Sequence, residues 1–126
     1  MMLKNILIVG LGGGIGSVAR YLCQKYFYEY HPNPFPFGTF IVNILGCFLI
    51  GIFFALSEKG NIISHEWRIF LTTGICGGFT TFSSFAYENV TLIKAGDYLN
   101  FGLYAAASVA LGILATFCGI AVMKLI

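Results

Sequence analysis

The third apolar segment of this sequence carries residues that could bind or conduct an ion. Adjacent glycines, hydroxyl residues and phenylalanines follow one another in the run Gly74-Ile75-Cys76-Gly77-Gly78-Phe79-Thr80-Thr81-Phe82-Ser83-Ser84-Phe85. Glycine, threonine and serine are poor helix formers, and unwound backbone at membrane depth is tolerated only where protein buries it or where it lines a polar cavity. A helix break here would free carbonyl oxygens near Gly77 and Thr80, which are good ligands for a small hard cation.

The residues after the glycines combine aromatic and hydroxyl side chains. Phe82 and Phe85 are three apart and share one helical face, and Ser83 and Ser84 lie between them. A polar stripe beside an aromatic one predicts a conduction path. The alternative is that the glycines only admit a crossing helix, while the hydroxyls bond back to their own backbone.

Other apolar segments offer polar partners for this stripe. Asn43 lies in an otherwise apolar run, where a carboxamide is costly unless it is hydrogen-bonded, and Tyr104 and Ser108 are four apart on the last segment. Alternatives remain for each: a helix-to-helix hydrogen bond for Asn43 and an interfacial position for Tyr104. Arg20 fits a pore mouth or a side chain that extends to the membrane interface.

The composition shows which elements must position these residues. The chain has 126 residues, of which 58% are hydrophobic and 10% charged, against roughly 25% charged in soluble proteins. Residues 5–19, 30–57, 69–87 and 98–123 carry no formal charge, and about 20 apolar residues cross a bilayer. We therefore expect an all-α membrane protein, a single domain over residues 1–126 with four spans at about 5–28, 35–57, 67–92 and 98–123.

Small residues recur at four-residue spacing, which lets membrane helices approach closely. The motifs are Gly10-x-x-x-Gly14, Gly12-x-x-x-Gly16, Gly74-x-x-x-Gly78, Ser108-x-x-x-Gly112 and Ala115-x-x-x-Gly119. They predict tight helix packing. Because four spans are few for enclosing an ion pathway, we expect any conducting form to be an oligomer.

Basic residues give only a weak orientation signal. Four crossings would place Lys4, Lys59, Arg68 and Lys124 on one side, against Lys25, Lys94 and the nearby Arg20 on the other. Since basic residues in short loops set orientation, a bias of four against three permits insertion both ways. The net charge is only +2, and the basic residues do not cluster into a patch that would indicate nucleic-acid binding.

The sequence does not fit an enzyme. It has no nucleophile elbow, phosphate loop or metal-ligand motif, and its four cysteines lie one per span without a C-x-x-C pair. Buried cysteine usually acts as a small hydrophobic residue. Passive transport is the favoured class.

Three blocks of the sequence closely resemble the Fluc (CrcB) family of bacterial fluoride channels. They are Gly13-Gly14-Ile15-Gly16-Ser17-Val18-Ala19-Arg20-Tyr21, Gly38-Thr39-Phe40-Ile41-Val42-Asn43-Ile44-Leu45-Gly46-Cys47-Phe48, and the run from Gly74 to Phe85 with Glu88 after it. The third block is the most specific. The resemblance implies a fluoride-specific channel that passively exports fluoride across the bacterial inner membrane, built as a dual-topology, antiparallel homodimer with a broken third helix.

The resemblance also implies roles for individual residues. Backbone carbonyls of Gly77 and Thr80 would hold a structural sodium ion at the dimer centre. The fluoride pathway would comprise Asn43, Phe82, Ser83, Ser84, Phe85, Tyr104 and Ser108, with Arg20 at the pore mouth. This sequence differs from the family at two of these positions. Ser17 stands where the family often has alanine, and Ser84 where it often has threonine, and both residues remain small.

Two other functions share some of these features. A small multidrug antiporter also has four short spans, but its proton coupling needs an ionisable residue at depth, and its membrane glutamate in the first span has no counterpart here. Glu88 lies at the end of the third span instead. A non-conducting membrane subunit would explain the glycines and leave Asn43 and the phenylalanine stripe without a role.

Overall fold

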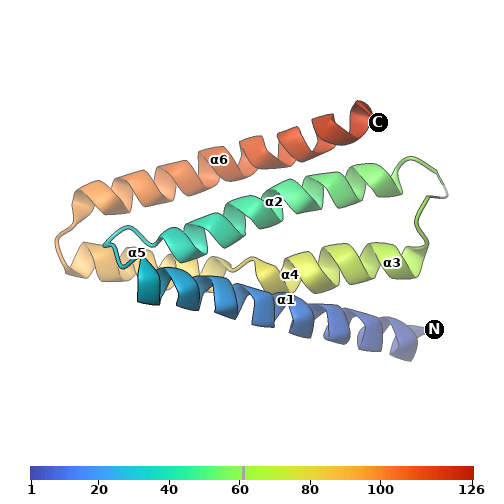
Figure 1. The fold of residues 1–126 in the computed structure, drawn as a ribbon, viewed down its shortest axis with the longest axis horizontal. Coiled ribbons are helices and arrows are strands. Elements are labelled where there is room, and N and C mark those ends of the chain that lie inside the picture. Colours follow the sequence, from blue (N-terminus) through green and yellow to red (C-terminus); the bar gives the residue numbers. More distant parts are fainter. Residues whose placement is uncertain (61) are drawn as a thin grey trace.

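The computed structural model describes residues 1–60 and 62–126, and the described residues form four long helical segments. These are α1 (Met2–Tyr30), α2 (Phe37–Ser57), a third segment over His65–Lys94 and α6 (Tyr98–Lys124). Each is long and apolar enough to cross a membrane. They run side by side, and both chain termini lie at the same end (Figure 1), as four crossings require.

The third segment is bent and built from several pieces. It comprises α3 (His65–Ile69), the π-helix η1 (Phe70–Cys76), α4 (Gly77–Phe79) and α5 (Phe82–Lys94). The expected break is present: it lies at Thr80 and Thr81, whereas the preceding glycine pair remains helical. Both residues have extended backbone, with φ −86° and ψ 157° at Thr80 and φ −151° and ψ 117° at Thr81.

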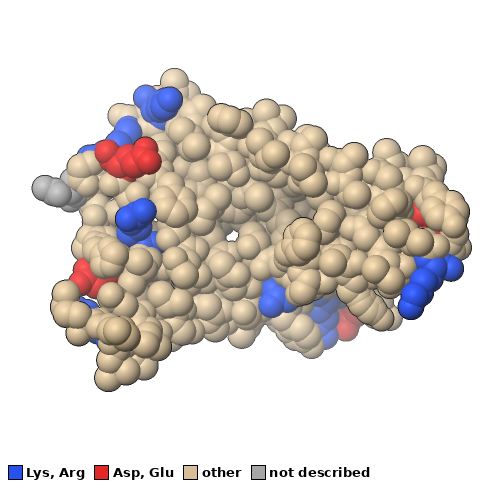
Figure 2. Space-filling model, turned by 180° about the vertical axis from the view of Figure 1, so that it is seen from behind, with Lys and Arg blue, Asp and Glu red and all other residues tan. Residues whose placement is uncertain are grey.

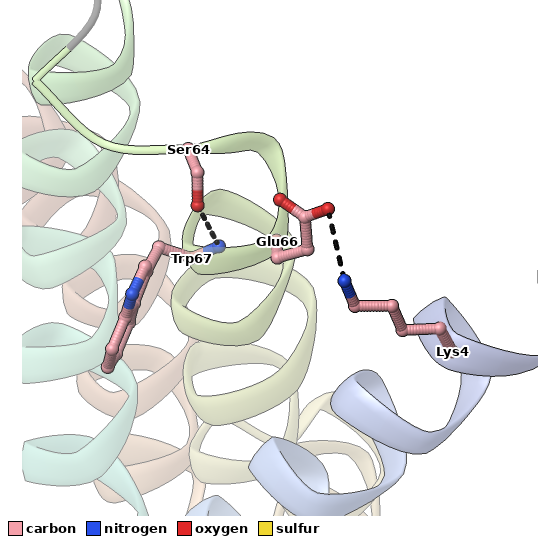
Figure 3. A network of polar contacts seen from close by, with 4 residues as sticks. All are labelled: Lys4, Ser64, Glu66 and Trp67. Atoms are coloured by element: carbon pink, nitrogen blue, oxygen red, sulfur yellow. Dashed lines mark hydrogen bonds and ion pairs between the residues drawn. The ribbon is translucent and has the colours of Figure 1, made fainter. Parts of the chain in front are cut away.

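Helix boundaries differ from the expected spans by a few residues, for local reasons. The second helix begins at Phe37 rather than 35, directly after Pro36, and proline favours such a boundary. The third begins at His65 because the Ser64 hydroxyl accepts a hydrogen bond from the Trp67 amide at the helix start. Lys4 of α1 forms an ion pair of 3.7 Å with Glu66 at this end (Figure 3).

Glycines position the third segment against α1. Added Cβ atoms at Gly12 and Gly16 would meet the backbone of Phe70 and Ile75, and one at Gly78 would overlap the Gly13 carbonyl oxygen. The two helices therefore touch through backbone, as small-residue motifs allow. In contrast, a Cβ atom added at Gly10 or Gly14 would meet no other part of the described chain within 4 Å, so their motif does not pack within the subunit.

The other close pair is α2 with α6. A Cβ atom at Gly51 would overlap the Thr116 carbonyl oxygen, and one at Gly119 would overlap that of Phe48. The Thr116 hydroxyl also donates to the Cys47 carbonyl oxygen across this contact, at 3.1 Å. These contacts bring Asn43 on α2 and Ser108 on α6 to the same side of the bundle as the helix break, where all line one cavity.

The molecular surface suits a bilayer. Many large apolar side chains are exposed, among them Leu7, Leu11, Val109 and Phe117, whereas most charged side chains on the face in Figure 2 lie toward its two ends. Apolar surface of this extent is stable in contact with lipid rather than water. The described residues form a multi-pass membrane protein of four helical spans.

Candidate ion pathway

The helix break is held by the side chain of Asn43. Its Oδ1 accepts from the Thr81 backbone N–H at 2.7 Å, and its Nδ2 donates to the Thr81 carbonyl oxygen at 3.0 Å. A carboxamide has two N–H donors, so one remains after these bonds. The expected hydrogen bonding of Asn43 is thus met by the backbone of the break.

Arg20 of α1 also contacts the break. Its Nε donates to the Gly78 carbonyl oxygen at 3.0 Å, and its side chain is partly buried. In an uninterrupted helix this carbonyl would accept from the amide four residues later. Arg20 therefore supplies a bond that the break removes, a role that neither expected alternative included.

The start of α5 is capped locally. The Thr81 hydroxyl accepts from the Ser84 backbone N–H at 3.1 Å and lies 3.3 Å from the Ser83 hydroxyl. This N-cap satisfies one free amide of the helix start. Ser83 is exposed and Ser84 is half-buried, so both lie beside the break, although neither lines the cavity described next.

An open cavity of about 370 Å³ lies against the break. Six of the residues expected to act in conduction or cation binding line it: Asn43, Gly77, Thr80, Phe82, Phe85 and Ser108. The Ser108 hydroxyl oxygen is buried and has no hydrogen-bond partner among the described residues. Arg20, Ser83, Ser84 and Tyr104 lie outside its lining.

Aromatic rings connect this cavity to the interior. The ring centroids of Phe82 and Phe85 are 5.6 Å apart, and those of Phe85 and Tyr104 are 5.0 Å apart. Phe82 is 80% exposed, whereas Tyr104 is fully buried. The Tyr104 ring therefore packs inside the bundle against Phe85 and does not lie on the outer surface of the subunit.

A chain of hydrogen bonds continues from Tyr104. Its hydroxyl donates to Glu88 Oε1 at 2.8 Å, and Glu88 Oε2 accepts from the Thr39 hydroxyl at 2.7 Å. Gln24 Nε2 in turn donates to the Thr39 hydroxyl oxygen at 2.9 Å. Gln24, Thr39 and Glu88 line a second open cavity of about 590 Å³, which the connection from Tyr30 to Phe37 also borders.

Some backbone carbonyls at the break have no partner. None of the hydrogen bonds found among the described residues ends on the carbonyl oxygen of Gly77 or Thr80. Gly77 is exposed and Thr80 is half-buried. The two residues expected to bind a cation thus present free oxygens beside the cavity.

Residues 7–120 match the family model described as CrcB-like protein, Camphor Resistance (CrcB). The chain belongs to the CrcB family. Its relatives within this family include the fluoride-specific ion channel FluC of Flavobacterium psychrophilum, which is 46% identical over 97% of this chain and 98% of the relative. The protein of the same name from Phocaeicola vulgatus is 49% identical over 94% of this chain and 97% of the relative. That from Leptospira interrogans is 41% identical over 96% of this chain and 95% of the relative.

Membership of the CrcB family confirms the resemblance seen in the three sequence blocks. These relatives bear the name of an ion channel, which confirms that the CrcB chain is not an enzyme. The antiporter and the non-conducting subunit are therefore not favoured. The roles of individual site residues stay predictions.

Sequence reasoning missed part of this CrcB site. Gln24 and Thr39 received no role, and Glu88 was considered only as a proton-coupling acid. A usable signal was present, since Thr39 is a polar residue in an apolar segment and Glu88 lies at the end of the third span. Buried polar groups need partners, but the sequence did not show that these three bond to one another.

Proposed function

We propose that this chain forms a fluoride-specific channel, which passively conducts fluoride across the bacterial inner membrane. One observation carries the proposal: Phe85, Tyr104 and Glu88 link the two open cavities of the subunit through ring contact and hydrogen bonding. The names of the CrcB relatives at 41% to 49% identity support it.

The chemistry of the first cavity suits fluoride. This ion is small and strongly hydrated, so a path must replace its water with hydrogen-bond donors. Asn43 has a second amide N–H beyond its bond to Thr81, and the buried Ser108 hydroxyl has no partner among the described residues. Ring edges carry partial positive charge, so Phe82 and Phe85 can face an anion. Each group is uncharged, and therefore none binds the ion as a fixed counter-charge would.

Exposed groups at the break support assembly of two copies. Gly77 is exposed, Thr80 is half-buried, and Phe82 is 80% exposed on the open side of the first cavity. Free backbone carbonyls cannot face hydrocarbon without a cost of several kcal/mol. A second copy would cover this side. The basic residues, four against three, permit that copy to insert in the opposite orientation, which gives an antiparallel homodimer.

Sodium fits the free carbonyl oxygens at the centre of such a dimer. Gly77 and Thr80 have carbonyls without donors, and oxygen ligands suit small hard cations. The C-terminal end of a half-helix also favours a cation, as in other membrane proteins with interrupted helices. When bound, sodium would supply a fixed positive charge near the pathway. The residues of the chain would set its position through the backbone of the break.

Arg20 and the second cavity complete the proposed pathway. Arg20 lies beside the break and places a cationic group near the first cavity, which suits a pore mouth for an anion. The second cavity, with Gln24 and Thr39, would form the other mouth. Because nothing in this arrangement couples transport to an energy source, fluoride would follow its electrochemical gradient, and the net effect in a bacterium would be export.

Flux measurements on purified protein in liposomes test this function. We expect fast electrogenic release of fluoride down its gradient and exclusion of chloride. Empty liposomes serve as the control, and the same preparation is assayed with a cationic drug gradient. Equal chloride flux, or exchange of the drug for protons, would contradict the proposal.

A further inference from the structure

The helix break leaves a short series of backbone groups without helical partners. With Thr80 and Thr81 extended, the carbonyls of residues 77–81 lose the amides four residues later that an unbroken helix would provide. Backbone groups at membrane depth need replacement partners. The identity of those partners decides which oxygens are satisfied by the chain and which remain available.

Two side chains satisfy part of this series. Arg20 Nε donates to the Gly78 carbonyl at 3.0 Å, and Asn43 Nδ2 donates to the Thr81 carbonyl at 3.0 Å. Asn43 also accepts from the Thr81 amide at 2.7 Å, which fixes the orientation of that peptide group. Each side chain comes from a different helix, α1 or α2, so the break is held from both sides.

The remaining carbonyls are those of Gly77, Phe79 and Thr80, on which no hydrogen bond found among the described residues ends. Phe79 is buried at 8% exposure, whereas Gly77 is exposed and Thr80 half-buried. Two of the three free carbonyls therefore belong to residues that are at least partly exposed, and these residues flank Gly78, whose carbonyl Arg20 occupies.

We propose that Arg20 and Asn43 are positioning residues that determine which carbonyl oxygens of the break can bind a cation. By engaging Gly78 and Thr81, they leave Gly77 and Thr80 as the accessible pair and fix the peptide planes around them. This inference rests on the proposed function for the presence of the cation. It gives both residues a role through the backbone, in addition to any contact with fluoride.

The proposal is tested by sodium binding, measured without fluoride. Purified protein in detergent is titrated with NaCl at constant ionic strength, with N-methyl-glucamine chloride as replacement, and the melting temperature is recorded. We expect Arg20→Met to raise the half-maximal sodium concentration about 10- to 100-fold, as loss of groups that orient ligands does. Arg20→Lys, which retains a charged N–H donor group but not the guanidinium geometry, should give a smaller rise.

Controls separate positioning from general loss of stability. Arg68→Met removes the same type of charge from a residue that lies over the Phe54 ring, away from the break, and it should keep the wild-type sodium midpoint. Asn43→Leu removes both bonds to Thr81 and should raise the midpoint like Arg20→Met. A purely structural role would lower the melting temperature at every sodium concentration and leave the midpoint unchanged.

The possible outcomes distinguish this inference from the proposed function. If the wild type is not stabilised by sodium, the cation and the inference both fail. If the wild type responds and Arg20→Met and Asn43→Leu keep its midpoint, the inference alone is overturned. Should Arg20→Met fail to fold, the smaller rise expected for Arg20→Lys decides the matter, because an unchanged midpoint in that variant contradicts the positioning role.

Discussion

The Tyr104 hydroxyl donates a hydrogen bond to Glu88 Oε1 across the packing contact between α6 and α5, at an oxygen-to-oxygen distance of 2.8 Å. The Tyr104 side chain is fully buried, and Glu88 also accepts from Thr39. The bond therefore joins an aromatic ring next to the first cavity to a carboxylate that lines the second. Removing it would change both the stability of the subunit and the polar route between the cavities.

Tyr104→Phe tests this relationship with the smallest possible change. It leaves one Glu88 oxygen without its donor, so we expect a loss of about 1–3 kcal/mol in the free energy of unfolding together with slower fluoride efflux. Tyr98→Phe is the matched control, because Tyr98 is on the same helix and 66% exposed. Unfolding in detergent and liposome efflux provide the measurements. Equal behaviour of the two variants would show that the bond has no functional role.

The two phenylalanines at the break are expected to act on the ion rather than only on packing. Phe82→Ile and Phe85→Ile remove the ring edges but keep apolar bulk. We expect each to slow fluoride efflux about tenfold or more, equivalent to about 1.4 kcal/mol in the barrier, while dimers persist by size-exclusion chromatography. Phe117→Ile, at an exposed ring on α6, should keep the wild-type rate. Wild-type rates in both test variants would reduce the aromatic stripe to a packing role.

The two adjacent glycines should respond differently to alanine. A Cβ atom at Gly78 would overlap the Gly13 carbonyl oxygen, whereas one at Gly77 would come only into ordinary contact with the Thr72 carbonyl oxygen, at 3.8 Å. We expect Gly78→Ala to destabilise the fold by about 1–3 kcal/mol, as overpacking does, and Gly77→Ala to have a small effect. Melting temperatures in detergent compare them. A larger loss for Gly77→Ala would contradict the described packing of α1.

Dual topology predicts that fixing the orientation of all copies abolishes conduction. Lys25→Gln with Lys94→Gln leaves four basic residues on one side against Arg20 alone. A second variant carries Lys4→Gln, Lys59→Gln and Lys124→Gln, which leaves Arg68 alone on its side against three basic residues on the other. Because loop charges set orientation, each set alone should lose fluoride efflux from cells, and co-expression should restore it. Full activity of both sets expressed separately would argue against antiparallel assembly.

Sequence reasoning predicted an interruption of the third span within the run from Gly74 to Phe85, but it did not fix the residue at which the helix opens. The glycine pair belongs to this run, yet Gly77 and Gly78 remain helical, and the backbone of α1 packs closely against Gly78. The backbone opens at Thr80 and Thr81, where Asn43 supplies replacement hydrogen bonds. Local helix propensity indicates where a helix is weak, whereas the available partners decide where it opens.

The sequence by itself determined the four apolar spans, the weak charge bias and the set of polar residues in the third span. These properties follow from local composition, because hydrophobic length and charge are sums over neighbouring residues. Only the tertiary structure decided that Arg20 bonds to Gly78, 58 residues away, and that Asn43 bonds to Thr81, 38 residues away. It also decided that Thr39, Glu88 and Tyr104 meet. Such bonds depend on which helix faces touch, and the close approach of α1 and α2 to the interrupted segment sets those contacts.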